Sequence, residues 1–249
     1  MKKIYTLLAL TISFSMNAQV STNSTSPTGT YASAMGNGTT ASGNESTAMG
    51  YDTTASGEAS TAMGYSTAAS AQSSTAMGKT TIASGINSTA MGRETTASGD
   101  TSTGMGRSTT ASGDDSTAMG NNTVASGYNS TAMGRETTAS GDTSTAMGRR
   151  TTARDYASVV IGQYNSSGSS ATSASSFSTS APAFVIGNGT ASNAKSDAFK
   201  VMFNGDATVS NDLTVSGDVV ISSDARLKSN IVSLGSTLPK LLQIDGKSY

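Results

Sequence analysis

A serine and a lysine near the C-terminus carry the residue types that could do covalent chemistry. Ser223 and Lys228 lie in the run Ser-Asp-Ala-Arg-Leu-Lys-Ser-Asn-Ile, residues 223–231. A serine hydroxyl becomes a useful nucleophile when a neighbouring base takes its proton, and a lysine can be that base only if burial lowers its pKa. The 249-residue sequence contains no histidine, which excludes a Ser-His-Asp triad.

The same run has a simpler interpretation. Ser223 and Asp224 are residue types that cap the start of a helix, and Arg226 and Lys228 would then be solvated. On the chemistry of these residues alone, the helix cap is favoured over a peptidase site.

Acidic residues recur at regular intervals in the middle of the sequence: Glu94, Asp100, Asp114, Glu136 and Asp142. They could suggest calcium, but they lack the G-G-x-G-x-D pattern of calcium-binding rolls. They alternate with Arg93, Arg107 and Arg135, which favours surface ion pairs. We therefore expect no metal site and no cofactor.

A 14-residue period runs from Ala34 to Gly162 and includes these acidic residues. Its anchor is an apolar residue followed by glycine, and Ala-Ser-Gly stands halfway between anchors, as at residues 41–43. The anchors are Met35, Met49, Met63, Met77, Met91, Met105, Met119, Met133, Met147 and Ile161. Fixed-period self-similarity predicts a repeat architecture whose units bury surface against their neighbours.

The half-period of seven residues does not indicate a coiled coil. A heptad seam needs two large apolar residues per seven, whereas these heptads are rich in Gly, Ser and Thr, which are poor helix formers. Short Thr-rich runs closed by Gly and two polar residues predict strand, turn, strand. We expect an all-β parallel β-solenoid with two strands per 14-residue coil.

Substitutions along each column suggest which side chains face inward. The column of Thr40 and Thr47 accepts Ile82 and Val124, so we expect it to face the interior, together with the methionines. The opposite face would then carry the constant columns of Thr39, Ser46 and Ala41.

One such coil buries little apolar surface relative to the entropy of ordering it, and an exposed alanine column would permit close approach of another chain. We therefore expect an obligate oligomer. The alternative is a monomer in which alanine fills a tight coil. A net charge of −1 and the absence of a basic patch give no indication of a nucleic-acid partner.

The repeat region resembles the head repeats of YadA-like trimeric adhesins. The resemblance is carried by Asn-Ser-Thr-Ala-Met-Gly at 87–92 with Ala-Ser-Gly at 97–99, and it covers residues 31–165. It implies a left-handed parallel β-roll, a homotrimer, and display on a bacterial surface for binding host or matrix molecules. This sequence has Thr and Met where the family usually has Val and Ile.

The N-terminus has the features of a signal peptide. Lys2 and Lys3 precede an apolar stretch that is too short for a membrane span, and Ala18–Gln19 is the expected cleavage point. We expect a signal peptide at residues 1–18, a linker at 19–30, and a secreted protein at the bacterial cell surface, associated with the outer membrane. No other apolar run is long enough to cross a bilayer.

Two further segments follow the repeats. Residues 166–181 are mostly Ser, Ala, Thr and Gly and predict a flexible linker. Residues 182–222 predict a short β neck with strands at 183–186, 198–203, 207–209, 213–215 and 219–222.

Residues 223–249 are similar to the start of the endosialidase-type intramolecular chaperone, an α-containing domain that trimerises fibrous proteins and then cuts itself off by a Ser–Lys peptidase reaction. The resemblance implies that Ser223 is the nucleophile, Lys228 the general base and Ser222–Ser223 the bond cut. With it, the peptidase interpretation is favoured over the helix cap. The family's domain extends beyond the position of Tyr249, so we expect the domain to be incomplete in this sequence.

Together these features predict an exported, trimeric, adhesin-like fibre that binds through its β-roll head. The main alternative is a purely structural fibre whose only activity is chaperone-driven assembly and self-cleavage. A minor alternative is an ice-binding solenoid, suggested by the ladder of Thr39 and its equivalents, which we expected to face outward.

Overall fold

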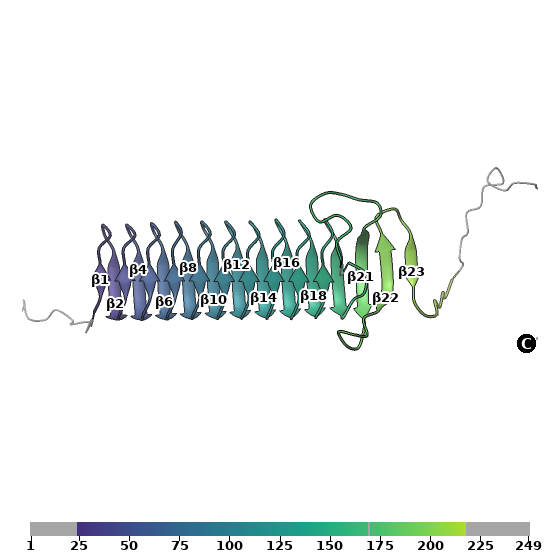
Figure 1. Ribbon diagram of the computed structural model, residues 1–249, viewed down its shortest axis with the longest axis horizontal. Coiled ribbons are helices and arrows are strands. Elements are labelled where there is room, and N and C mark those ends of the chain that lie inside the picture. Colours follow the sequence, from purple (N-terminus) through teal and green to yellow (C-terminus); the bar gives the residue numbers. More distant parts are fainter. Residues whose placement is uncertain (1–23, 169, 218–249) are drawn as a thin grey trace, which may run out of the picture. The chain divides into compact units, whose positions relative to one another are not determined.

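A computed structural model describes residues 24–168 and 170–217, and these form strands, turns and loops with no helix (Figure 1). All strands lie in one compact unit that ends at Asn211. The expected all-β parallel solenoid of 14-residue coils is confirmed.

Each coil contributes one five-residue strand and one two-residue strand, which stack into two sheets. The long-strand sheet contains β2 (Ser33–Asn37), β4 (Thr47–Tyr51), β6 (Thr61–Tyr65), β8 (Thr75–Lys79), β10 (Thr89–Arg93), β12 (Thr103–Arg107), β14 (Thr117–Asn121), β16 (Thr131–Arg135), β18 (Thr145–Arg149) and β20 (Val159–Gln163). The short-strand sheet contains β1 (Ser26–Pro27), β3 (Thr40–Ala41), β5 (Thr54–Ala55), β7 (Ala68–Ala69), β9 (Ile82–Ala83), β11 (Thr96–Ala97), β13 (Thr110–Ala111), β15 (Val124–Ala125), β17 (Thr138–Ala139) and β19 (Thr152–Ala153).

The register places each residue beside the equivalent residue of the next coil. In the pairing of β10 with β12, Met91 lies beside Met105 and Gly92 beside Gly106. The columns seen in the sequence are therefore continuous ladders in space.

The turns continue the same ladder. Each coil has a left-handed residue in each of its two turns, such as Glu94 with φ 55° and Thr101 with φ 53°. Their backbone N–H groups donate to the carbonyls of Lys79 and Ile86 in the preceding coil. Because these backbone groups are satisfied between coils, the turn side chains are free to vary.

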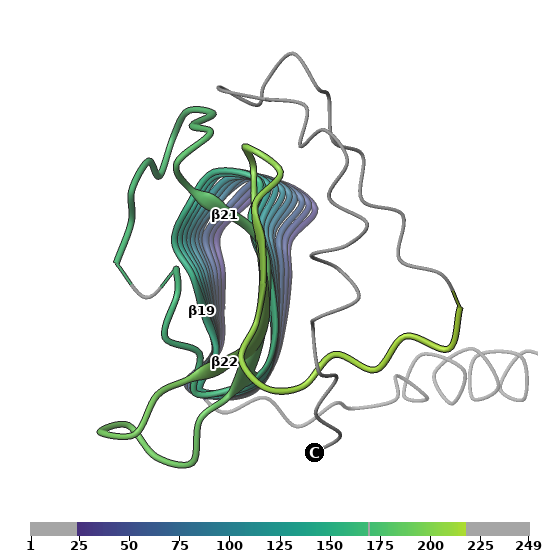
Figure 2. The same cartoon turned by 90° about the vertical axis from the view of Figure 1, so that its right-hand side faces the viewer.

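The interior is lined by the columns that were expected to face outward, so that expectation was wrong. Ala41 and Ala48 are fully buried, as are Thr39 and Ser46 and nearly all their equivalents in other coils. The end view in Figure 2 shows the two sheets facing each other across this narrow interior. The methionines and the columns of Thr40 and Thr47 lie on the outer faces instead, and Ile82 is 43% exposed.

The physical reason is the small distance between the two sheets. The interior columns contain Ala, Ser and Thr in nearly every coil, and the largest apolar side chains that are fully buried are Val160 and Val185. Met and Ile appear in the outer columns because the interior columns have no space for side chains of that length. The alanine column therefore fills the interior of the coil and offers no contact surface to another chain.

Beyond the coils, β21 (Pro182–Asn188) pairs with β20 in parallel, and β22 (Asp197–Met202) and β23 (Ala207–Val209) follow antiparallel. Three of the expected strands are thus present. Residues 213–215 form no strand, and 219–222 lie outside the described residues.

The segment between β20 and β21 is fastened to the last coils. The Asp155 carboxylate, which is fully buried, accepts the backbone N–H groups of Thr172 and Ser173. The N–H groups of Asp142 and Tyr156 donate to the carbonyls of Ala174 and Ser173.

Candidate binding surfaces

A ladder of apolar side chains runs along the outer face of the long-strand sheet. It comprises Met35, Met49, Met63, Met77, Met91, Met105, Met119, Met133, Met147, Ile161 and Ile186, each paired in register with the next. Nearly all the methionines are half-buried, and Met105 is 38% exposed. We call this surface the Met ladder. A continuous apolar stripe on an outer face is typical of an interaction surface.

Cations and tyrosines gather along the turn that leaves each long strand, which we call the basic edge. Its cations are Lys79, Arg93, Arg107, Arg135, Arg149 and Arg150, and its anions are Asp52, Glu94 and Glu136. Tyr51 stacks on Tyr65 with ring centroids 5.1 Å apart, and Lys79 Nζ lies 5.5 Å from the Tyr65 ring.

Two glutamates neutralise part of the basic edge. Ser108 and then Arg93 donate hydrogen bonds to the Glu94 carboxylate, and these hold the pKa of Glu94 below its ordinary value. The hydrogen bond from Arg150 lowers the pKa of Glu136 and raises that of Arg150. The expected ion pairs are therefore confirmed for both glutamates.

Anions gather along the opposite turn, which enters each long strand and which we call the acidic edge. Its residues are Glu45, Glu58, Asp100, Asp114, Asp115 and Asp142, and its turn positions within the described coils contain no Lys or Arg.

The expected ion pairing was wrong for the three aspartates in this set. Asp100, Asp114 and Asp142 lie across the coil from the arginines, and each carboxylate accepts a backbone N–H from the coil before it. The Asp100 Oδ1 atom, for example, lies 2.8 Å from the Ile86 nitrogen. These aspartates hold one turn onto the next.

This separation of charge could have been found in the sequence. Acidic residues follow Ala-Ser-Gly, as at Asp100 and Asp142, whereas basic residues follow Met-Gly, as at Arg107 and Arg135. The two motifs are half a coil apart in the sequence, and half a coil of chain leads from one edge of the solenoid to the other.

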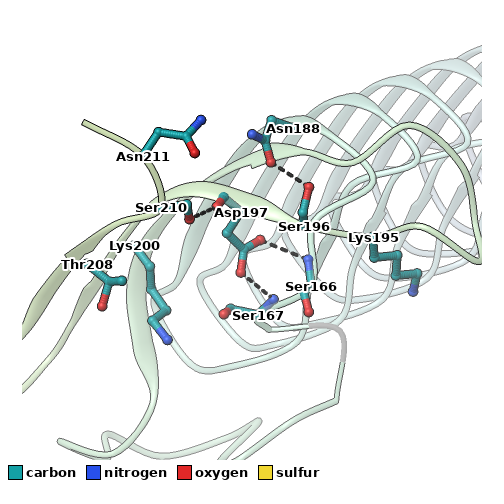
Figure 3. Close-up of a pocket in the computed structure, with 10 residues that line it drawn as sticks. All are labelled: Ser166, Ser167, Asn188, Lys195, Ser196, Asp197, Lys200, Thr208, Ser210 and Asn211. Atoms are coloured by element: carbon teal, nitrogen blue, oxygen red, sulfur yellow. Dashed lines mark hydrogen bonds between the residues drawn. The ribbon is translucent and has the colours of Figure 1, made fainter. Parts of the chain in front are cut away.

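A polar pocket of about 510 Å³ lies beside β22, after the last coil (Figure 3). Its central carboxylate, Asp197, accepts backbone N–H groups from Ser166 and Ser167, both at 2.8 Å. The Ser196 hydroxyl donates to Asn188 Oδ1, and that of Ser210 to the Asp197 carbonyl. Asp197 thus fastens the chain after β20 to β22, which is a structural role.

No set of three or more potential metal ligands clusters within residues 24–168 and 170–217. Over the same residues there is no helix able to cross a membrane. The signal peptide at 1–18 and the site residues Ser223 and Lys228 lie outside the described part of the chain and stay predictions.

The ice-binding alternative depended on an outward face formed by Thr39 and its equivalents. That column is fully buried in almost every coil, so it presents no surface to water.

The stacked 14-residue coils, the glycine after every anchor and the outward Met ladder define the class as a parallel β-solenoid built from head-type repeats. The YadA head domain repeat model, which spans two copies, matches at 28–53, 41–67, 55–81, 69–95, 83–109, 97–123, 111–137, 125–151 and 139–165. These matches cover more than half of the chain, which therefore belongs to the YadA head family. A comparison with curated proteins found no match.

Proposed function

We propose that this protein is an exported, homotrimeric, adhesin-like surface fibre whose solenoid is the binding head. Membership of the YadA head family supports the adhesin-like role. We infer the trimer from the Met ladder, a half-buried apolar stripe along the outer face of the long-strand sheet.

The occupant of the Met ladder is a second copy of this chain. The ladder repeats once per coil, at about 4.8 Å, and a copy of the same chain presents apolar side chains at the same spacing. The rod also needs the contact, because its interior contains only small side chains. Several of its buried hydroxyls, including those of Thr81 and Ser88, have no hydrogen-bond partner among the residues that the structure describes.

Charge on the Met ladder should disrupt the assembly. The double variant Met77→Asp/Met91→Asp should sediment as a monomer, because burying two carboxylates per chain in an apolar interface is costly. The control is Thr96→Asp, on the outer face of the short-strand sheet, which should stay trimeric. A trimeric double variant would contradict the use of this face.

Binding of the purified trimer to collagen, fibronectin and whole cells tests the adhesive role. We expect saturable binding to at least one of them. Uniform absence of binding would leave the alternative, a structural fibre whose activity is self-assembly.

The proposed fibre is exported and associated with the cell surface. Residues 1–18 direct export and are removed after Ala18, and the mature protein associates with the outer membrane. Mass spectrometry of the secreted species should give Gln19 as the first residue, and retention of residues 1–18 would contradict this.

The C-terminal residues 223–249 begin a self-cleaving chaperone in which Ser223 attacks and Lys228 is the base. The full-length gene product should be cut between Ser222 and Ser223. Ser223→Ala and Lys228→Ala should both abolish the cut, and the control Ser229→Ala should not. An intact wild-type product would refute the assignment.

A further inference from the structure

The two charged edges lie on opposite sides of the Met ladder. Each long strand begins just after the acidic edge and ends at the basic edge, as β12 does between Asp100 and Arg107. If the Met ladder forms an interface with another chain, the acidic edge therefore lies along one border of that interface and the basic edge along the other.

Within one chain the two edges do not satisfy each other. A five-residue strand separates them, which spans about 17 Å at roughly 3.3 Å per residue. That distance exceeds the Debye length of about 8 Å at physiological salt. In the described residues neither Lys79 nor Arg107 forms a salt bridge, and no acidic-edge carboxylate does.

We propose that in the trimer the acidic edge of each chain meets the basic edge of the next chain, and that this pairing imposes a parallel, in-register arrangement. The inference rests on the proposed trimer. When three flat rods turn the same face toward a common axis, the left edge of each lies beside the right edge of its neighbour. Here those edges have opposite charge.

An antiparallel arrangement gives the opposite result. Turning one rod end over end and packing it face to face on another places acidic edge over acidic edge and basic over basic. The Met ladder alone does not distinguish the two arrangements, because apolar contacts have no direction. Charges at the rim of an interface supply orientation and partner choice.

The register can be tested with Arg107 and Asp114, which lie half a coil apart on the two edges. Arg107→Glu is compatible with the fold because Tyr51 and Asn121 occupy equivalent positions. Asp114→Lys removes an acceptor for the Asp100 N–H, but Ile86 and Tyr128 occupy the same position in other coils without one. Asp114→Asn is the matched control, because it keeps an acceptor oxygen and removes only the charge.

The measurement is the melting temperature of the full-chain trimer at low and high salt. We expect each single reversal to lower it by several degrees at 20 mM NaCl, Asp114→Asn to lower it less, and the double reversal Arg107→Glu/Asp114→Lys to restore most of it. High salt should remove these differences. Since the two residues are too far apart to interact in one chain, such coupling reports contact between chains.

Different results would contradict the trimer and the contact between the charged edges. A wild-type protein that sediments as a monomer would overturn both the trimer and the edge contact. A stable trimer in which the two reversals are additive and insensitive to salt would overturn the edge contact alone and leave the trimer intact.

Discussion

At the scale of single residues, the glycine after each anchor is the strictest requirement of the coil. Gly92 has φ +119°, and a Cβ there would lie 2.0 Å from the carbonyl oxygen of Gly106. The glycine of Ala-Ser-Gly is less strict, since Ala71 and Asp155 replace it in two coils. Both glycines approach a carbonyl oxygen of the next coil equally closely, so the positive φ of the anchor glycine explains why only that glycine is constant.

Gly92→Ala should therefore lower the free energy of unfolding by about 3 kcal/mol or more, because both the backbone conformation and the clash oppose it. The control is Gly38→Asn, at φ +66°, where Asp52 and Ser66 hold side chains in equivalent positions. It should change stability by about 0.5 kcal/mol or less. Equal effects of the two variants in denaturant titrations would contradict this account of the anchor glycine.

The buried threonines differ in whether their hydroxyls are satisfied. Thr81 Oγ1 is buried and has no partner within residues 24–168 and 170–217. Thr95 Oγ1, by contrast, donates to the Gly106 carbonyl at 3.2 Å and accepts from Thr109. Thr95 can form these two hydrogen bonds because Gly104 has no Cβ, and the Cγ2 atom of Thr95 occupies the space where that Cβ would lie.

Thr81→Val should raise the free energy of unfolding by about 1 kcal/mol, since it removes an unsatisfied hydroxyl and keeps the shape. Thr95→Val should lower it by a similar amount because two hydrogen bonds are lost. Denaturant midpoints of the two variants against wild type provide the check. A change of the same sign in both would show that the hydroxyls do not differ as described.

At the scale of elements, the strands and their period could be predicted from the sequence, but the side on which each column lies could not. Alternation along a strand says only that Ala48 and Met49 face opposite ways. Val124 and Ile82 suggested an interior column, yet both lie on the outer face of the short-strand sheet, and Ile82 is an exposed residue. Constancy of small residues, as at Ala41, was the better indicator of burial.

The loop between β20 and β21 shows a second limit. Its composition predicts a linker, yet the carboxylate of Asp155 and the backbone N–H groups of Asp142 and Tyr156 attach it to the last coils. Asp155 stands at a position that is glycine in most coils. Nothing in the local sequence pairs Asp155 with Thr172 and Ser173, because their contact arises from the winding of the last coil.

Asp155→Ala should release this loop. Hydrogen exchange at Thr172 and Ser173 should become faster by about tenfold or more, because their N–H groups lose a charged acceptor. Arg154→Ala, next to it and exposed, should leave exchange unchanged. Unchanged protection in Asp155→Ala would mean that the carboxylate does not hold the loop.

At the scale of the whole molecule, the rod buries little apolar surface in its interior and carries an apolar stripe on its outer face. The coil ladders satisfy the backbone, but nearly all the buried side chains of the coils are Ala, Ser and Thr, and the methionines line the outer face. The sequence predicted that a single rod would need partners. It assigned the contact to the alanine column, and the structure places the methionines where a partner can reach them.

The most direct test of the central claim is the mass of the mature protein in solution, measured by sedimentation equilibrium over a range of concentrations. The account predicts three times the chain mass, with no folded monomer at concentrations where the trimer dissociates. A well-ordered species of one chain mass, with the β-sheet circular dichroism of the intact solenoid, would contradict it.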